Sequence, residues 1–380
     1  MKHQILAMML EDIHQQGEVV VAASPGIQEQ IGAIVAGRGR GEIDRIYLVG
    51  CGDSLYAGMA ARLAIQEWSG IWVESVESLE FRYLAGGLSD RSAVVGISVS
   101  GQVQRTLDSL EVARERGAFT VGITGTPNSR IHTCADHVID IGIRGREPGP
   151  VPGTVSYLAN LTTLYWLGLA FGLDTEHLSS AEEMGHRQAI LMALGQIREV
   201  AEQNEARIGR YVQEHSAPQP LVLVGGGPNW ATAHLGVAKL LEAALVLGVV
   251  QELEEWVHEQ YFLTGPNLHT ILIGADGVTA DRLSPMARAA VELGAPLAVI
   301  LPEGLDLGVE AAAVWRYPSG IPELVSPIVT SAPIELLAHS LATNLDRHPF
   351  DYDNPARKQV SERTIYRNGM SAQAISRQQP

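Results

Sequence analysis

The chain contains two copies of one sequence unit, separated by 175 residues. The first copy starts with a glycine turn at residues 50–54, and the second starts with a glycine turn at residues 225–229. In both copies an apolar, β-branched run precedes the turn, and a helical run and a second β-branched run follow it. The same superposition aligns three pairs of glutamates, which are Glu67 and Glu242, Glu77 and Glu252, and Glu80 and Glu255. A long period with two copies indicates a duplicated α/β domain and not a solenoid.

Length, composition and charge agree with two domains and restrict the partners. A chain of 380 residues is a little over two domains at about 150 residues each. Its 46% hydrophobic and 18% charged residues are sufficient for two buried cores. The net charge of −16 argues against a general nucleic-acid binder, which needs a basic surface to meet phosphates. An anionic small molecule remains compatible, because a pocket of backbone amides can hold it locally.

Cysteine usage and the start of the chain exclude further classes. With two cysteines, Cys51 and Cys134, the chain is no disulfide scaffold. No His-Glu-x-x-His pattern and no Cys/His cluster occurs, so we expect neither a metal nor another cofactor. The first residues carry no basic segment followed by an apolar one, and we find no apolar run of about 20 residues. We therefore expect a cytoplasmic protein without a membrane partner.

Strand-like and helix-like segments alternate along both halves. Apolar, β-branched strands are predicted at 45–49, 70–76, 93–98, 119–124 and 137–143, and again at 221–224, 268–273, 296–301 and 313–317. Helices of ordinary length lie between them, among them 55–68, 106–116, 231–247 and 281–293. This alternation is typical of a doubly wound parallel sheet.

The remaining segments suggest how the halves are organised. Two helices, 5–21 and 27–35, precede the first strand, and a longer helix over 182–215 links the halves. We divide the chain into a first domain (1–205), a second domain (206–350) and a polar, basic C-terminal tail (351–380) that covers the site.

Two loops of the first domain follow strands and precede helices. In sheets of this kind ligands bind beyond the carboxyl ends of the strands. Backbone amides at helix starts, together with serine hydroxyls, form a cradle for an anion such as a phosphate. The dinucleotide fingerprint Gly-x-Gly-x-x-Gly and the Gly-Lys-Ser/Thr motif for nucleoside triphosphates are both missing. The predicted binding residues are Gly52, Asp53 and Ser54 in the first loop, and Ser98, Ser100 and Gln102 in the second.

The Gly-Cys-Gly-x-Ser turn at 50–54, the loop at 97–101 and the doubling resemble the sugar isomerase (SIS) domain family. The paired arrangement resembles the isomerase half of glucosamine-6-phosphate synthase and its relatives, and it extends over the whole chain, including residues 11–16 and 351–355. The resemblance implies two tandem, flavodoxin-like, doubly wound SIS domains. The relatives include ketose/aldose phosphate isomerases, amino-sugar phosphate deaminases and fructosamine-phosphate deglycases.

The resemblance also assigns catalytic residues in the second domain. Its Lys-x-x-Glu motif corresponds to Lys239 and Glu242. Lys239 is expected to bind substrate, and Glu242 is expected to move a proton between C1 and C2 of the sugar. His258 matches the histidine that assists ring opening, and Glu255 matches a glutamate three residues before it. Aldose–ketose interconversion requires such a base and an acid–base group near the ring oxygen.

This sequence departs from the family pattern in the cradle and in the tail. Asp53 and Val103 replace threonines, and Val99 replaces a glutamine. Lys358 lies near the family's imine-forming lysine but out of register with it. We therefore expect Lys358 to contact substrate without forming an imine. This chain shows no glutaminase domain, so glutamine is not the expected nitrogen source.

The resulting hypothesis is an enzyme that acts on a sugar phosphate. Aldose–ketose isomerisation and isomerisation or deamination of an amino-sugar phosphate are equally compatible, because one proton shuttle serves them all. The alternatives are a fructosamine-phosphate deglycase and a non-catalytic sugar-phosphate-binding regulator. In similar enzymes the histidine segment completes the neighbouring subunit's site. We therefore expect a homodimer that combines Glu242 of one subunit with His258 of the other.

Overall fold

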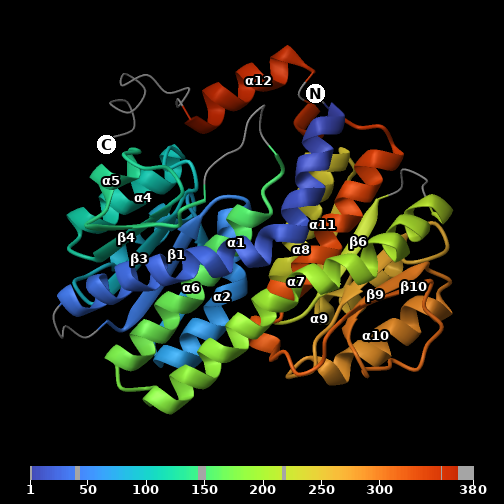
Figure 1. Ribbon diagram of the computed structural model, residues 1–380, viewed down its shortest axis with the longest axis horizontal. Coiled ribbons are helices and arrows are strands. Elements are labelled where there is room, and N and C mark those ends of the chain that lie inside the picture. Colours follow the sequence, from blue (N-terminus) through green and yellow to red (C-terminus); the bar gives the residue numbers. More distant parts are fainter. Residues whose placement is uncertain (1, 39–42, 144–150, 216–219, 352, 367–380) are drawn as a thin grey trace.

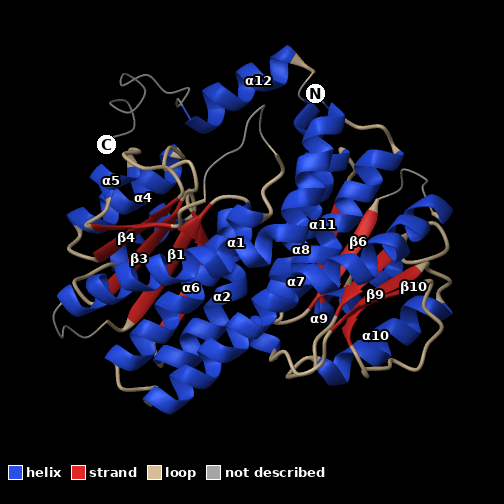
Figure 2. Cartoon of the chain, in the orientation of Figure 1, coloured by secondary structure: helices blue, strands red, loops and turns tan. Residues whose placement is uncertain are grey.

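The structure is a computed structural model that describes all residues except 1, 39–42, 144–150, 216–219, 352 and 367–380. For residues 358, 361, 362 and 366 it describes the backbone without the side chains. Two parallel sheets with helices on their faces form the two halves of the molecule (Figures 1 and 2). The predicted α/β class with two tandem doubly wound sheets is therefore confirmed.

The first sheet has the strand order β2-β1-β3-β4-β5 and is parallel throughout. Its strands are β1 (Arg45–Gly50), β2 (Trp72–Glu77), β3 (Ser92–Ile97), β4 (Phe119–Thr124) and β5 (His137–Asp140). The central strands β1, β3 and β4 are buried almost throughout. Helices cover both faces, which explains their nearly continuous apolar sequences.

The second sheet repeats this arrangement. Its strands are β6 (Leu221–Gly225), β7 (Gly248–Glu252), β8 (His269–Ile273), β9 (Leu297–Pro302) and β10 (Ala313–Tyr317). Read from the β7 edge, the order β7-β6-β8-β9-β10 is that of the first sheet. The duplication seen in the sequence is therefore a duplication of the fold.

The helices that the sequence analysis predicted are present, with differences in two places, and further helices such as α11 were not predicted. Before the second sheet they are α1 (Lys2–Gly37), α2 (Asp53–Ser69), α3 (Phe81–Leu84), α4 (Gln104–Glu115), α5 (Ile131–Cys134), α6 (Val155–Asp174) and α7 (Ser180–Glu214). After it begins they are α8 (Pro228–Lys239), α9 (Leu253–His258), α10 (Ala280–Glu292), α11 (Pro327–Asn344) and α12 (Pro355–Ser361). The two helices expected at the N-terminus form one helix that contains Pro25. The helix expected at 231–247 changes at Leu240 into a π-helix, Leu240–Ala244.

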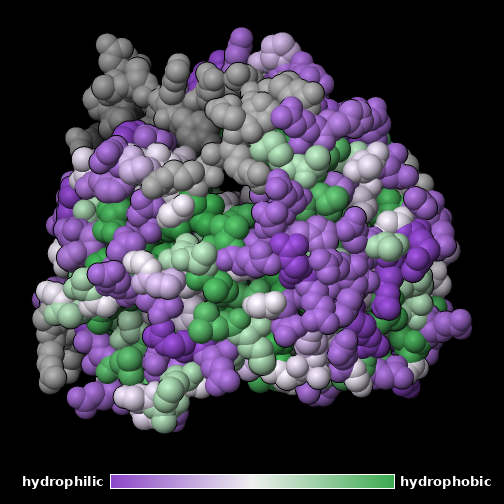
Figure 3. Space-filling model, in the orientation of Figure 1, coloured by the Kyte–Doolittle hydropathy of each residue, from purple (hydrophilic) through white to green (hydrophobic). Residues whose placement is uncertain are grey.

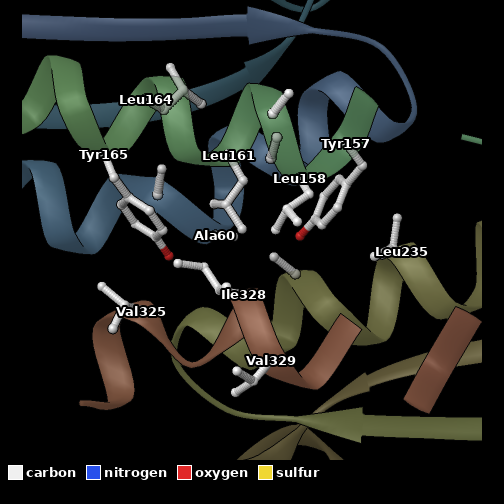
Figure 4. Packing of buried hydrophobic residues seen from close by; sticks show 14 of the residues in the cluster. Ala60, Tyr157, Leu158, Leu161, Leu164, Tyr165, Leu235, Val325, Ile328 and Val329 are labelled. Atoms are coloured by element: carbon white, nitrogen blue, oxygen red, sulfur yellow. The ribbon is translucent and has the colours of Figure 1, made fainter. Parts of the chain in front are cut away.

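One hydrophobic core extends across both halves. It includes buried residues of α1, α2, α6, α7, α8 and α11, and two smaller cores lie on the outer faces of the two sheets. Figure 4 shows Tyr157, Leu161 and Tyr165 of α6 directed toward the segment that carries Val325 and Ile328. The hydroxyl of Tyr165 donates to the backbone carbonyl of Leu324 at 2.8 Å. The inner helices of both sheets are thus packed against one another.

The helix α1 differs from the expectation that no apolar run is long enough to span a membrane, because by length and composition it could cross one. In the structure one face of this helix is buried. Its buried face, which includes Ile5, Met9, Ile13 and Val20, packs against α6 and α7. Figure 3 shows hydrophobic residues at the surface in the middle of the face where α1, α2 and α6 lie, and mostly hydrophilic residues over the second half.

The domain division remains a prediction that the fold qualifies. The boundary between residues 205 and 206 falls inside α7. This helix packs against α1, α6 and α11 and therefore belongs to both halves. In the tail, α12 lies at the top of Figure 1, and the preceding segment Pro349–Asp351 contacts α1.

Candidate active site

Two loops lie at the carboxyl ends of β1 and β3, the neighbouring strands at which the order of the first sheet reverses. After β1, Gly52 has a φ of +56°, which glycine adopts without strain, and α2 begins at the next residue. After β3, residues 98–103 lead into α4. Open α/β sheets bind their ligands at this position.

The serines of the predicted cradle have weak partners in these loops. The Ser100 Oγ accepts the N–H of Gln102 at 3.3 Å, and the Ser98 Oγ accepts the N–H of Val103 at 3.5 Å. Both distances lie beyond the usual range of N–H···O hydrogen bonds. Ser54 is nearly buried in the first turn of α2. The loop could exchange these weak contacts for an anion, and this role remains a prediction.

Lys239 connects the two halves at the centre of the candidate site. Its side chain is fully buried, and its Nζ lies 2.6 Å from Asp53 Oδ2 and 2.6 Å from Glu242 Oε2. The two carboxylates keep 22% and 29% of their side-chain surface exposed. A buried ammonium requires such partners, because an unpaired charge in the interior is very unfavourable.

The packing of α2 against α8 brings these three residues together. Asp53 is the first residue of α2, and Lys239 is the last residue of α8. Glu242 lies in the π-helix that continues α8, and Leu245, the residue directly after this π-helix, has a φ of +54°. Such π-helical turns occur frequently at functional sites.

The charged neighbours of Glu242 and Lys239 influence the pKa values of these two side chains. Burial has the largest influence on Glu242, and with the charge of Asp53 it raises the Glu242 pKa to about 7 against the opposing effect of Lys239. Burial lowers the pKa of Lys239, but the carboxylates of Asp53 and Glu242 outweigh it and raise that pKa above its ordinary value. The lysine is therefore held as an ammonium, and Glu242 can exchange a proton near neutral pH.

Two further features enclose this charged group. A Cβ atom on Gly153 would lie 3.0 Å from Asp53 Oδ2, so the backbone of the loop before α6 covers the ion pair closely. On another side, Tyr56 stacks on His234 with ring centroids 5.2 Å apart. Burial and the charges of Asp53 and Glu242 raise the pKa of the Tyr56 hydroxyl.

A second buried polar group was missed from the sequence. Glu335 of α11 is fully buried, and its Oε2 accepts a hydrogen bond from Gln16 Nε2 of α1 at 2.6 Å. Burial is the main cause that raises the pKa of Glu335 to about 7, and the charge of Asp53 adds to it. Within the described residues, Glu335 Oε1, Gln16 Oε1 and the Tyr157 hydroxyl have no hydrogen-bond partner. A carboxylate inside the apolar run 327–338 was the signal that could have revealed this group.

His258 and Glu255 lie elsewhere on the surface. Both are exposed on the short helix α9, and His258 Nε2 is 3.6 Å from Glu254 Oε1. No hydrogen bond or ion pair between described residues joins either side chain to Glu242. A second copy of the chain could supply His258, and its role remains a prediction.

The other predicted features lie partly outside the described residues. Lys358 belongs to α12, and its side chain is not described. Among the described residues, no group of three or more His, Cys, Asp or Glu side chains is arranged to hold a metal ion. The expectation of a site without metal or cofactor stays a prediction.

Comparison with known sequences finds the SIS domain family and relatives that share one name. Residues 42–170 match the SIS domain family. The chain is 29% identical over 360 residues to a protein of Gloeobacter violaceus named glutamine–fructose-6-phosphate aminotransferase (isomerizing), covering 91% of this chain and 57% of that protein. A protein of the same name from Aquifex aeolicus is 27% identical over 315 residues, covering 82% of this chain and 50% of that one. The chain therefore spans about half the length of the curated relatives that it matches.

Solved structures share the fold over most of the chain. The C-terminal domain of glucosamine-fructose-6-phosphate aminotransferase from Francisella tularensis superposes with a TM-score of 0.78 at 20% identity, covering 89% of this chain and 96% of that one. Glucosamine-6-phosphate deaminase from Thermotoga maritima superposes with a TM-score of 0.65 at 15% identity, covering 88% of this chain and 96% of that one. At 20% and 15% sequence identity, the similarity to these two structures shows a shared fold alone.

Proposed function

We propose that this chain, a member of the SIS-domain family that carries the fold in two tandem copies, is an enzyme that acts on a sugar phosphate through proton transfer. The observation that carries this proposal is the Lys239 ammonium held between Asp53 and Glu242. The relatives named above include an isomerizing aminotransferase and a deaminase. Both names describe reactions of a sugar phosphate in which an amino group is transferred or removed.

In this proposal Glu242 is the general base. Its carboxylate removes a proton from the hydroxyl- or amino-bearing carbon next to the carbonyl, and the carbonyl oxygen gains negative charge. The proton then returns to the former carbonyl carbon, while the proton of that hydroxyl or amino group passes to the charged oxygen. A base with a pKa of about 7 is well matched to this task near neutral pH. The exposed 29% of the Glu242 side chain gives a substrate access to it. Lys239 supplies the positive charge that favours the anionic intermediate.

The substrate's phosphate is assigned to the cradle of the first half. The N–H groups of Gln102 and Val103 and the hydroxyls of Ser98 and Ser100 are its proposed donors. Their present hydrogen bonds are long, so little is lost when an anion replaces them. Charge-assisted bonds to a phosphate are stronger than the neutral bonds that they replace.

We further propose a homodimer in the cytoplasm whose sites are shared between subunits. His258 is exposed and separate from Glu242 in one chain, so a second copy is the proposed source of the acid–base group for ring opening. The reaction is proposed to run without glutamine, either as aldose–ketose isomerisation or as isomerisation or deamination of an amino-sugar phosphate. Deglycation of a fructosamine phosphate is the alternative that uses the same shuttle.

A substrate panel read by NMR tests this function. Hexose phosphates, amino-sugar phosphates and fructosamine phosphates are each incubated with the wild type, with Glu242→Gln and with Glu303→Gln, an exposed glutamate that serves as control. We expect turnover of at least one class by the wild type and the control, with a loss of roughly 10²–10⁴-fold in Glu242→Gln. Binding of a sugar phosphate without turnover of any class would instead indicate the regulator.

A further inference from the structure

The second half of the molecule contains its own version of the anion cradle. Gly227 has φ +54° and ψ −131°, and Gly52 in the first half has φ +56° and ψ −130°. Both glycines directly precede a helix. The loops after β3 and β8 also correspond, because the N–H of Ser98 donates to the carbonyl of Ile123 and that of Gly274 donates to the carbonyl of Ile300, each at 2.9 Å.

In the second half this cradle holds a carboxylate of the chain itself. Glu323 Oε2 accepts the N–H of Val278 at 2.6 Å. Its Oε1 accepts the N–H of Thr279 at 3.3 Å and the hydroxyl of Thr279 at 2.5 Å. Glu323 is only 9% exposed. Two backbone amides and a hydroxyl at the start of a helix are the groups with which proteins hold a bound anion.

The glycines of both loops make room for this carboxylate. A Cβ atom on Gly277 would lie 2.4 Å from Glu323 Oε2, and a Cβ atom on Gly227 would lie 3.7 Å from Glu323 Oε1. The carboxylate therefore lies between the glycine turn after β6 and the loop after β8. Just beyond the loop begins α10, a helix of 13 residues whose N-terminal dipole favours negative charge.

The equivalent amides of the first half have weaker partners. By their position in the loop, Gln102 and Val103 correspond to Val278 and Thr279. Among the described residues, their N–H groups donate to the hydroxyls of Ser100 and Ser98 at 3.3 and 3.5 Å. In the second half the same two positions bind a buried carboxylate at 2.6 and 3.3 Å.

We infer that the second half retains an anion site whose permanent ligand is Glu323. This carboxylate takes the place of a free phosphate, so the duplicated chain binds one sugar phosphate, at the first half. The inference concerns occupancy and stoichiometry and does not depend on which reaction the enzyme catalyses. Removal of the carboxylate should convert the cradle into a binding site for inorganic phosphate.

The test compares Glu323→Ala with the wild type and with Glu310→Ala, an exposed glutamate of the same half. Titration calorimetry with inorganic phosphate should count one more phosphate per chain in Glu323→Ala than in the wild type and the control. Phosphate should also raise the melting temperature of Glu323→Ala more than sodium chloride of equal ionic strength does. Equal phosphate stoichiometry and equal thermal response in the three proteins would overturn the inference.

Two further variants keep the result decisive if Glu323→Ala folds poorly. Glu323→Gln still fills the cradle, so it should lose stability without binding an extra phosphate. Adding Gly277→Ala to Glu323→Ala places a methyl group where the carboxylate lay, and this should abolish the extra phosphate. If Glu323→Ala is unfolded in chloride, recovery of its folded state in phosphate supports the inference, and failure to recover contradicts it.

Discussion

Lys239 Nζ lies 2.6 Å from the carboxylate of Asp53, a residue 186 positions earlier in the chain and in the other half of the molecule. The lysine is fully buried and also contacts Glu242 at 2.6 Å. One aspartate therefore helps to stabilise the contact between the halves and influences the ionisation of the proposed base. One of the residues that depart from the family pattern thus lies at the centre of the site.

Replacement of Asp53 by asparagine should change the pH dependence of the reaction. The charge of Asp53 raises the pKa of Glu242, so its loss should lower that pKa and move the acidic limb of kcat/KM to lower pH. Lys239 would keep one carboxylate partner. The free energy of unfolding should therefore fall by about 1–3 kcal/mol, the cost of weakening one charged hydrogen bond.

The control for this variant is Asp90→Asn, which changes an exposed aspartate. It should leave both the pH profile and the unfolding curve unchanged. A pH profile for Asp53→Asn that coincides with the wild-type profile would show that Asp53 does not tune Glu242.

Most of the fold could be predicted because strands and turns depend on local sequence. The apolar, β-branched runs predicted the central strands, and the repeat predicted two equivalent sheets. The N-terminal region differed, because two helices were expected where the structure has one helix that continues through Pro25. In the structure the buried residues Val20, Ser24 and Ile27 continue on one face across this position. Packing of that face outweighs the local cost of proline.

The site was predicted only in part, because a sequence pattern predicts contacts between residues close in the chain and not contacts between the two halves. Glu242 and Lys239 are three positions apart, so their contact follows from helical spacing. The contact of Asp53 with Lys239 depends on how the two halves pack, which no local pattern encodes. Asp53 was therefore predicted only as a substrate-binding residue. The pair of Gln16 and Glu335 joins α1 to α11 and was missed for the same reason.

The serines of the first cradle should contribute to substrate affinity. Loss of one charge-assisted hydrogen bond in Ser100→Ala should weaken binding by roughly 1–2 kcal/mol, and Ser98→Ala should act in the same direction. Calorimetric titration of a sugar phosphate measures the effect, with the exposed Ser89 of a different loop changed to alanine for comparison. Unchanged affinity in both Ser98→Ala and Ser100→Ala would reject the assignment.

Subunits with different defects should complement one another. Glu242→Gln and His258→Ala homodimers should each have low activity. A mixed dimer should contain one intact site, composed of Glu242 from one subunit and His258 from the other. Co-expression with two affinity tags isolates this species for assay. If proven heterodimers remain as inactive as the parents, the shared site is wrong.

Glu335 should make stability depend on pH. Its pKa is raised from the ordinary 4.5 to about 7, mainly by burial, so the folded protein retains a proton that the unfolded chain releases. The stabilisation is present below pH 4.5 and is lost as the pH rises through about 7. Glu335→Gln has no proton to lose. Relative to wild type, the free energy of unfolding of Glu335→Gln should therefore rise by about 2 kcal/mol between pH 5.5 and pH 8.

Urea unfolding at the two pH values measures this gain. The exposed Glu310, changed to glutamine, should show the same difference from wild type at both pH values. If the free energy of unfolding of Glu335→Gln also differs from that of wild type by the same amount at pH 5.5 and at pH 8, Glu335 is ionised in the folded protein throughout this range.

The most direct measurement of the central claim follows deuterium from solvent into the sugar phosphate identified by the substrate panel. In D₂O the wild type should place deuterium at C1 or C2 of the product or of recovered substrate, because Glu242 exchanges the proton that it carries. Glu242→Gln should slow this exchange by roughly 10²–10⁴-fold while retaining the fold, and the exposed Glu303→Gln should not. Exchange that proceeds as fast in Glu242→Gln as in the wild type would contradict the account and make Glu255 the first candidate for the base.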